Sequence, residues 1–310
     1  MNLNHLDAFC LVVKTGSITK AAKKLHISQP ALSLQIQDLE DNFQTVLLER
    51  SNKGVRATEM GQLVFNYGQK ILNLTKNLQK EIDNHMNTVK EELFVGASST
   101  IGNFALPCSI YIFKEKFSKN NIYLDISDTK NVVEKLIEGS INIGVIEGPL
   151  VNSFKELIKS EDLRVKKIAQ DELVIVAPYN EEWQDKNEIN RKELRELKLI
   201  LREKGSGIRE TIEETFLERN IPLNELNIVL ELNSINAIVS AVTAERGTTI
   251  LPKMALRKEL RHRTLKGLKV EGLTFNHPIY LIYYPNGNGN KPNLSSSFID
   301  FLISKERGFC

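Results

Sequence analysis

The stretch GSITKAAKKLHISQPALSLQIQDLE, residues 16–40, decides how the N-terminal part of the chain folds. Ser17 and Ser28 each stand where a helix N-cap belongs, and Pro30 falls in a first helical turn, where proline is tolerated. The helix between the two serines has an apolar stripe of Ile18, Ala21, Ala22 and Leu25. An earlier amphipathic helix carries Leu3, Leu6, Phe9 and Val13. Two short helices joined by a tight turn are typical of a helix-turn-helix.

The last helix of this motif, over residues 29–43, has two distinct faces. One face is apolar and predicted to point into a core through Leu32, Ile36, Leu39 and Phe43. On the opposite face Leu34 suits the methyl groups of thymines, while Ser33 and Gln37 suit the polar edges of bases. The pattern therefore indicates a recognition helix for the major groove. The alternative is a solvated face that happens to include one leucine.

A basic hairpin is predicted within VLLERSNKGVRAT, residues 46–58. Its cations, at the tip and flanks, are Arg50, Lys53 and Arg56. Beside a recognition helix such a hairpin would be a wing, whose cations neutralise phosphates without discriminating between sequences. Taken alone, it is also compatible with an ordinary surface turn.

Together these segments closely resemble the helix-turn-helix and wing of LysR-type transcriptional regulators. The resemblance runs without a gap through residues 16–61 and rests on Ala21-Ala22, Leu25, Ser28-Gln29-Pro30, Ser33, Gln35-Ile36, Leu39-Glu40, Glu49-Arg50, Thr58-Glu59 and Gly61. It implies double-stranded promoter DNA as a partner, contacted by Ser28, Gln29, Pro30, Ser33, Leu34, Gln35 and Gln37. Many members carry a basic residue where this chain has Leu34, so we expect an apolar contact there.

A long helix with a narrow apolar seam is predicted for residues 59–89. The seam consists of Val64, Tyr67, Ile71, Leu74, Leu78, Ile82 and Val89. A stripe of this width is typical of a coiled coil, and the same helix of a second subunit is its simplest partner. The alternative is packing against the chain's own C-terminal domain. The family resemblance implies a homodimer, which often pairs again into a homotetramer.

From Leu93 onward, apolar strands alternate with amphipathic helices. This alternation predicts an α/β domain with a largely parallel sheet, long enough to form two lobes. The resemblance implies a periplasmic-binding-protein-like effector domain, of the branch related to regulators of sulfur metabolism and carbon fixation. The expected domains are 1–58 for the winged helix-turn-helix, 59–89 for the linker helix and 90–310 for the effector domain. Within the latter we expect lobe I at 90–168 and 268–310, and lobe II at 169–267.

Polar residues gather where several predicted strands end. The carboxyl ends of strands are where α/β sheets bind ligands, so we expect one cleft between the lobes. Hydroxyls and amides at helix starts favour an anion. We therefore expect a small anionic effector, and the resemblance implies that it contacts Ser98, Ser99, Thr100, Thr129, Glu147, Ser206 and Ser234 without identifying it. For each single hydroxyl the alternative is a helix cap.

Composition limits the remaining classes of function. A net charge of +2 does not by itself indicate nucleic-acid binding, and 41% hydrophobic residues suit a globular chain. No window approaches the roughly 18 apolar residues of a membrane span, and the N-terminus lacks a secretory pattern. We therefore expect a cytoplasmic, nucleoid-associated protein without a membrane partner. The resemblance adds RNA polymerase as a partner.

Other classes fit the sequence less well. The lack of a secretory pattern, together with the DNA-binding motif, argues against a transport-type solute-binding protein. Nucleophile elbow, phosphate loop and dinucleotide fingerprint are all missing, so we expect no enzyme, no catalytic residues and no cofactor. The five histidines and three cysteines are scattered, so we expect neither a metal site nor a disulfide. Cys108, next to Pro107 near a helix start, would suit a redox switch or a buried thiol.

Overall fold

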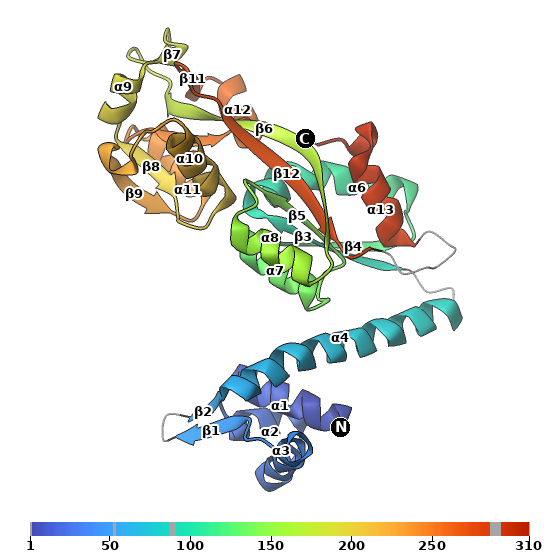
Figure 1. The fold of residues 1–310 in the computed structure, drawn as a ribbon. Helices are drawn as coiled ribbons and strands as arrows, with labels where there is room; N and C mark the ends of the chain where they lie inside the picture. Colours follow the sequence, from blue (N-terminus) through green and yellow to red (C-terminus); the bar gives the residue numbers. More distant parts are fainter. Residues whose placement is uncertain (1, 52–53, 87–90, 286–292, 310) are drawn as a thin grey trace. The chain divides into compact units, whose positions relative to one another are not determined.

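The structure, a computed structural model, divides into two compact units, one built mainly from residues 1–89 and the other mainly from residues 90–310 (Figure 1). Each unit encloses hydrophobic core of its own, as independently packed domains do. The residues that the structure describes are 2–51, 54–86, 91–285 and 293–309.

The N-terminal unit is a three-helix core followed by a hairpin and a long helix. Its elements are α1 (Leu3–Thr15), α2 (Ile18–Leu25), α3 (Gln29–Phe43), β1 (Leu48–Ser51), β2 (Gly54–Ala57) and α4 (Glu59–Met86). The predicted caps are confirmed, because the Ser17 hydroxyl accepts from the Lys20 amide and the Ser28 hydroxyl from the Ala31 amide, each at 3.3 Å. Gly16, at φ +62°, ends α1 in the left-handed conformation that glycine adopts without strain.

Helix α4 is not a free-standing linker where it begins. The Thr58 hydroxyl accepts from the Gly61 amide at 2.9 Å and donates to the Val46 carbonyl at 2.8 Å. A side chain at Gly61 would overlap with the Leu47 carbonyl, so the chain can pass this close to the hairpin only with glycine. Several α4 residues then pack on the core of α1–α3, namely Val64, Phe65, Ile71 and Leu72.

The C-terminal unit contains two lobes joined by two long strands, β6 (Arg164–Pro178) and β12 (Phe275–Tyr283) (Figure 1). Lobe I holds β3 (Glu92–Ser98), α5 (Ser99–Phe104), α6 (Leu106–Lys116), β4 (Asn121–Ser127), α7 (Thr129–Ile137), β5 (Ile143–Glu147), α8 (Asn152–Ser160) and α13 (Leu294–Ile303). Lobe II holds β7 (Glu188–Ile189), α9 (Arg191–Glu196), β8 (Leu199–Arg202), α10 (Gly207–Glu218), β9 (Ile228–Leu232), α11 (Ile235–Thr243), β10 (Thr249–Pro252), α12 (Arg257–Arg261) and β11 (Leu265–Val270). Short 3-10 turns span Leu223–Glu225, Lys253–Leu256 and Lys305–Arg307.

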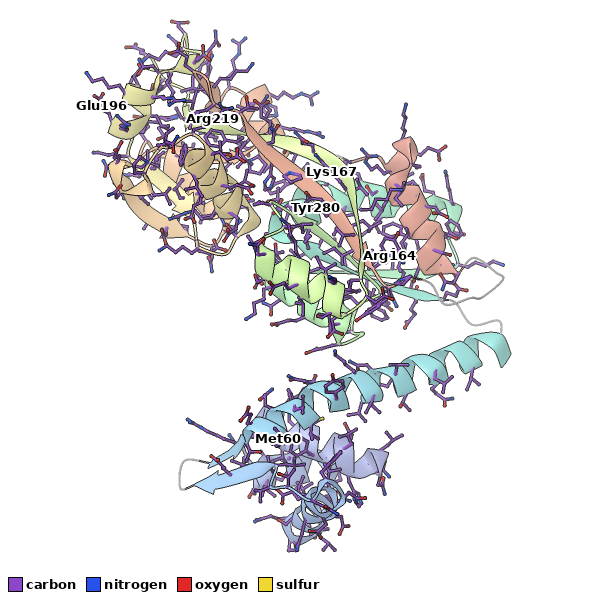
Figure 2. The ribbon with its side chains drawn as sticks, in the orientation of Figure 1. Met60, Arg164, Lys167, Glu196, Arg219 and Tyr280 are labelled. Carbon is purple, nitrogen blue, oxygen red and sulfur yellow. The ribbon has the colours of Figure 1, made fainter. Side chains whose placement is uncertain are left out.

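The main sheet is mixed rather than largely parallel. Its strand order is β4-β3-β5-β12-β6-β11-β7, with β10 also paired to β6, while β8 and β9 form a separate parallel pair. Strands β3, β4 and β5 are parallel as expected, but β12 runs antiparallel to both β5 and β6. Figure 2 shows two register partners on these long strands, Lys167 and Tyr280. The α/β alternation could not reveal that two strands would serve both lobes.

Two separate hydrophobic cores define the lobes. Along β6 the change of core falls between Ile168 and Leu173, close to the crossing that the sequence placed near Ala169. Along β12 it falls between Phe275 and Ile279. The predicted return near Leu268 is therefore too early, because Leu268 packs in the core of lobe II.

The cysteines differ from one another in state. Cys10 is a free, buried thiol, and burial raises its pKa to about 11. Cys108 is disulfide-bonded, so the expectation of a chain without disulfides is wrong for this residue. Cys310 lies outside the described residues.

No group of metal-ligating side chains is found within the part of the chain that the structure describes. None of the described helices is long and apolar enough to span a bilayer.

Candidate functional site

Helix α3 exposes its polar face, because the apolar residues on its other side are packed in the core. Leu32, Ile36 and Leu39 are at most 1% exposed and lock the helix into the N-terminal unit. Leu34, on the other side, is 60% exposed. The remaining predicted DNA contacts on α3 and its cap are exposed at Ser28, Gln29, Pro30 and Gln37 and half-buried at Ser33 and Gln35. The predicted core residue Phe43 is instead 41% exposed, because it lies in the last turn of α3.

A partly buried contact fixes the hairpin against α3. The Glu40 carboxylate accepts from the backbone amides of Leu47, at 2.7 Å, and Leu48, at 3.1 Å. The amide of Val55 donates to the carbonyl of Gly16 at 3.0 Å, which ties the returning strand to the turn after α1. Several residues behind the family resemblance, Gly16, Glu40, Thr58 and Gly61, thus hold the hairpin in place rather than face outward.

Of the three predicted hairpin cations, Arg56 is the one whose side chain the structure describes. Arg56 is exposed on β2, opposite Glu49 of β1 in the register. Arg50 pairs with Val55 through the backbone, but its side chain lies outside the described part. Lys53 lies outside the described residues altogether.

An apolar stripe along α4 has no partner within the described chain. We define the α4 stripe as the exposed residues Met60, Leu63, Tyr67, Leu74, Leu78 and Ile82. Met60, 44% exposed in the first turn, is labelled in Figure 2. The predicted seam was wrong at Val64 and Ile71, which pack on the core of their own unit. Leu63, one position from Val64, belongs to the exposed side instead. The predicted seam residue Val89 lies outside the described residues.

In lobe I, three parallel strands end in polar residues along one edge of the sheet. Ser98 of β3 is the register partner of Ser127 of β4, and β5 ends at Glu147. Ser98 is 2% and Thr100 is 0% exposed. The hydroxyls of Ser98, Thr100 and Ser127 are buried and find no hydrogen-bond partner among the described residues. Buried hydroxyls in this condition are unusual, since nearly all such groups in folded proteins are paired.

The Glu147 carboxylate connects this edge to lobe II. Its Oε1 accepts from the backbone amide of Thr100 at 3.3 Å, and its Oε2 lies 3.3 Å from Nε2 of His277 on β12. Nδ1 of His277 lies 2.8 Å from the hydroxyl of Thr211 on α10. Glu147, His277 and Thr211 are 4%, 1% and 2% exposed, so the chain of contacts is shielded from water. We call Glu147, His277 and Thr211 the interlobe relay.

The backbones of the lobes also meet at this point. A side chain on Gly207, the first residue of α10, would overlap with the Glu147 carbonyl. A side chain on Gly148 would overlap with the backbone of Gly207 in turn. Gly148 has φ +90°, which favours glycine for a second reason. Two glycines therefore permit an approach that closes the end of β5 against α10.

The other predicted effector residues cap helices or lie in first helical turns. The Ser206 hydroxyl accepts from the Arg209 amide at 3.2 Å, and the Ser234 hydroxyl from the Ala237 amide at 3.4 Å. Both serines are helix caps, the alternative that the sequence left open. Thr129 is buried in the first turn of α7, and Ser99 is half-buried at the start of α5.

Sequence reasoning missed Ser127, His277 and Thr211. Ser127 could have been found, because it ends a strand in the same way as Ser98. His277 lies inside a strand and Thr211 inside a helix, where no local pattern marks them.

Two cavities lie elsewhere. One of about 810 Å³ is in lobe II and has several basic residues in its lining, Lys253, Arg263, Lys266 and Lys269. Another of about 270 Å³ lies beside α6 and β4. Neither cavity is lined by a predicted effector residue. The predicted residues that lie close together, Ser98, Thr100 and Glu147, are buried instead.

Comparison with known proteins assigns both units. Residues 3–62 match the model of the bacterial regulatory helix-turn-helix proteins of the lysR family, and residues 87–306 match the LysR substrate binding domain. A relative from Gracilaria tenuistipitata var. liui, named a probable RuBisCO transcriptional regulator, is 32% identical over 92% of this chain and 90% of its own.

Two solved structures share the fold. CbnR in complex with its target DNA has a TM-score of 0.69 at 22% identity, covering 97% of this chain and 99% of its own. The regulatory domain of Synechocystis CcmR in complex with 2-PG has a TM-score of 0.57 at 20% identity, covering 69% of this chain and 96% of its own.

Proposed function

Because this chain belongs to the LysR family, it is a DNA-binding transcription regulator with an effector-binding domain and not an enzyme, and we propose which surfaces perform each task. Helix α3 discriminates between base pairs, the hairpin anchors phosphates, the α4 stripe joins two subunits, and the polar edge of lobe I holds a small anion. The regulator works in the cytoplasm, associated with the nucleoid, and cooperates there with RNA polymerase.

The observation that supports the DNA-reading surface is the exposed Leu34 between Ser33 and Gln37. A leucine exposed by 60% on a helix whose other face is fully buried costs little in water and gains a partner in a thymine methyl. Ser33 and Gln37, and around them Ser28, Gln29, Pro30 and Gln35, supply hydrogen-bonding groups or close contact at the groove. Arg56, with Arg50 and Lys53 of the hairpin, supplies phosphate contacts.

The α4 stripe supports a homodimer. Six large apolar side chains recur along one side of a 28-residue helix, from Met60 to Ile82. A second copy of α4 would cover them in the manner of a coiled coil. Two helix-turn-helix units would then face one duplex, so the natural site is an interrupted dyad. Pairing of such dimers gives the homotetramer.

The unpartnered hydroxyls support the anion site. Ser98, Thr100 and Ser127 each offer a buried O–H that finds no acceptor among the described residues. The oxygens of a carboxylate, phosphate or sulfate would accept all three. The remaining predicted residues, Ser99, Thr129, Ser206 and Ser234, stand at helix starts and stay part of the proposed effector contacts. We take 2-PG, the molecule bound by the CcmR regulatory domain, as the first organic probe.

The DNA-reading surface is tested with operator variants at several salt concentrations. Ser33→Ala and Gln37→Ala should change which variants bind best, because a lost base contact costs roughly 1–3 kcal/mol at its own position. Arg56→Ala should weaken all variants alike and lower the salt slope by about one. Uniform weakening by the helix variants, with altered preference from Arg56→Ala, would reverse the two assignments.

The anion site is tested by titrating the full chain with sulfate, phosphate and 2-PG. Ser98→Ala and Thr100→Val should each weaken binding by about tenfold, the effect of one lost hydrogen bond to a charged group. Unchanged binding in both variants would place the effector elsewhere. The basic cavity of lobe II would then be the next position to test.

A further inference from the structure

The interlobe relay joins the proposed anion site to lobe II through a buried carboxylate. Glu147 is on the last position of β5, His277 is on one of the two strands shared by the lobes, and Thr211 is on α10. A buried carboxylate is costly unless it is paired and hydrogen-bonded. Glu147 accepts from an amide in the first turn of α5, whose cap residue Ser98 makes no side-chain hydrogen bond, and it also contacts His277.

The hydrogen bonds of the relay leave one proton to be shared. With its proton on Nε2, His277 donates to Glu147. The Thr211 hydroxyl lies 2.8 Å from Nδ1 of His277 and 2.9 Å from the Gly207 carbonyl, and its single proton goes to one or the other. Glu147 then accepts at both oxygens, from the Thr100 amide and from His277. Each lobe thus contributes one end of the chain of contacts. Glu147 is the end in lobe I, and Thr211 is the end in lobe II.

The same carboxylate conflicts with an anionic ligand. An oxyanion that reached the hydroxyls of Ser98 and Thr100 would lie beside the Thr100 amide, where Glu147 already binds. Two negative groups at hydrogen-bonding distance in a buried site repel each other strongly.

Neither lysine nor arginine is at hand to offset this repulsion. Within the described chain neither residue type forms an ion pair with Glu147, and the side chain that contacts its carboxylate is the His277 ring. The two buried arginines of lobe II, Arg202 and Arg209, are already paired, with Glu203 and with Glu213 and Glu231. A ligand anion and the Glu147 carboxylate therefore cannot share the Thr100 amide.

We propose that Glu147 is an internal competitor of the effector: its carboxylate occupies the Thr100 amide until an oxyanion replaces it. Replacement frees Glu147 from Thr100 and disturbs its contact with His277, so occupation of lobe I is passed to α10 of lobe II. This inference rests on the anion site proposed above. Glu147 is then a specificity-determining residue, and His277 and Thr211 are positioning residues.

The test compares the anion affinity of full-length variants by calorimetry with phosphate, sulfate and 2-PG. Glu147→Gln removes the charge and keeps the shape, so affinity should rise by about 5- to 150-fold, the usual range of coupling between sites. A fall in affinity, or no change, would overturn the proposal. Glu147→Asp, which retains the negative charge, is the matched control and should not give the increase.

A second variant covers the case in which Glu147→Gln fails to fold. Thr211→Val removes the far end of the interlobe relay without touching Thr100 or Glu147. It should raise anion affinity in the same direction, by a smaller factor, because Glu147 is then held less firmly. A merely structural Thr211 would lower the unfolding temperature and leave anion affinity unchanged, which would also count against the proposal.

A spectroscopic readout follows the relay itself. Phosphate added to the wild type should shift the ring ¹⁵N resonances of His277, although His277 does not contact the anion. If these resonances do not move when phosphate is saturating, the proposed relay is wrong. If Ser98→Ala weakens anion binding while Glu147→Gln leaves it unchanged, the proposed site stands and the competitor fails. If neither variant changes binding, the site itself is wrong.

Discussion

The helix-turn-helix unit and the effector unit place their functional groups in opposite ways. In the first, Leu34 and Gln37 are exposed, and the buried residues beside them, such as Leu32 and Ile36, are apolar. In the second, the groups of interest, Thr100, Glu147 and His277, are among the most buried polar residues of the chain.

The difference follows from the size of the two partners. Duplex DNA is a large polyanion that meets an outer surface, so the residues that contact it stay solvated until it arrives. A small effector must be enclosed to be recognised, so its polar groups are buried and must satisfy one another when it is absent. A carboxylate from the same chain is one way to satisfy them.

Disrupting the α4 stripe should give the largest difference in effect between the two units. Leu74→Glu with Leu78→Glu places like charges in the proposed seam and should convert the dimer to a monomer. Operator affinity should fall by roughly 10²- to 10⁴-fold, because the second half-site is no longer tethered. Sedimentation and DNA titration would measure both effects, and anion binding should persist.

A matched control for the stripe is Ile71→Glu. Ile71 packs on the core of its own unit, so this variant should unfold the helix-turn-helix rather than dissociate a folded dimer. Wild-type protein sedimenting as a monomer at micromolar concentration would refute the seam.

The next effect concerns the effector unit alone. Gly207→Ala places a methyl group against the Glu147 carbonyl and should destabilise the C-terminal unit by about 1–3 kcal/mol. Gly205→Asn is the control, since position 205 has open space and asparagine tolerates its left-handed backbone. Thermal unfolding followed with a probe in each unit would show the change. Equal destabilisation by both variants would contradict the close approach at Gly207.

The smallest effect is a pH dependence confined to the helix-turn-helix unit. Burial raises the pKa of Cys10 from its ordinary value of 9.0 to about 11, so the folded unit favours the neutral thiol. Stability should be complete below pH 9 and decline as the pH rises towards 11. Cys10→Ala should remove that part of the decline. Unfolding midpoints between pH 8 and 11 provide the measurement, and identical slopes for both proteins would exclude the effect.

Local sequence determined most of the N-terminal unit. The caps at Ser17 and Ser28 and the outward position of Leu34 follow from helical periodicity and side-chain chemistry, which act over a few residues. Periodicity could not assign Val64 and Ile71, because a stripe on a helix does not reveal whether its own domain or a second copy covers it.

In the effector unit the sequence determined the strand ends, and tertiary structure decided what they meet. Ser98, Thr100 and Glu147 were recognisable because parallel strands bring their carboxyl ends to one edge. That Glu147 would meet His277, 130 positions further along the chain, depended on β12 returning antiparallel beside β5. Pairing of distant strands is fixed by the packing of the whole sheet, and no local pattern around His277 encodes it.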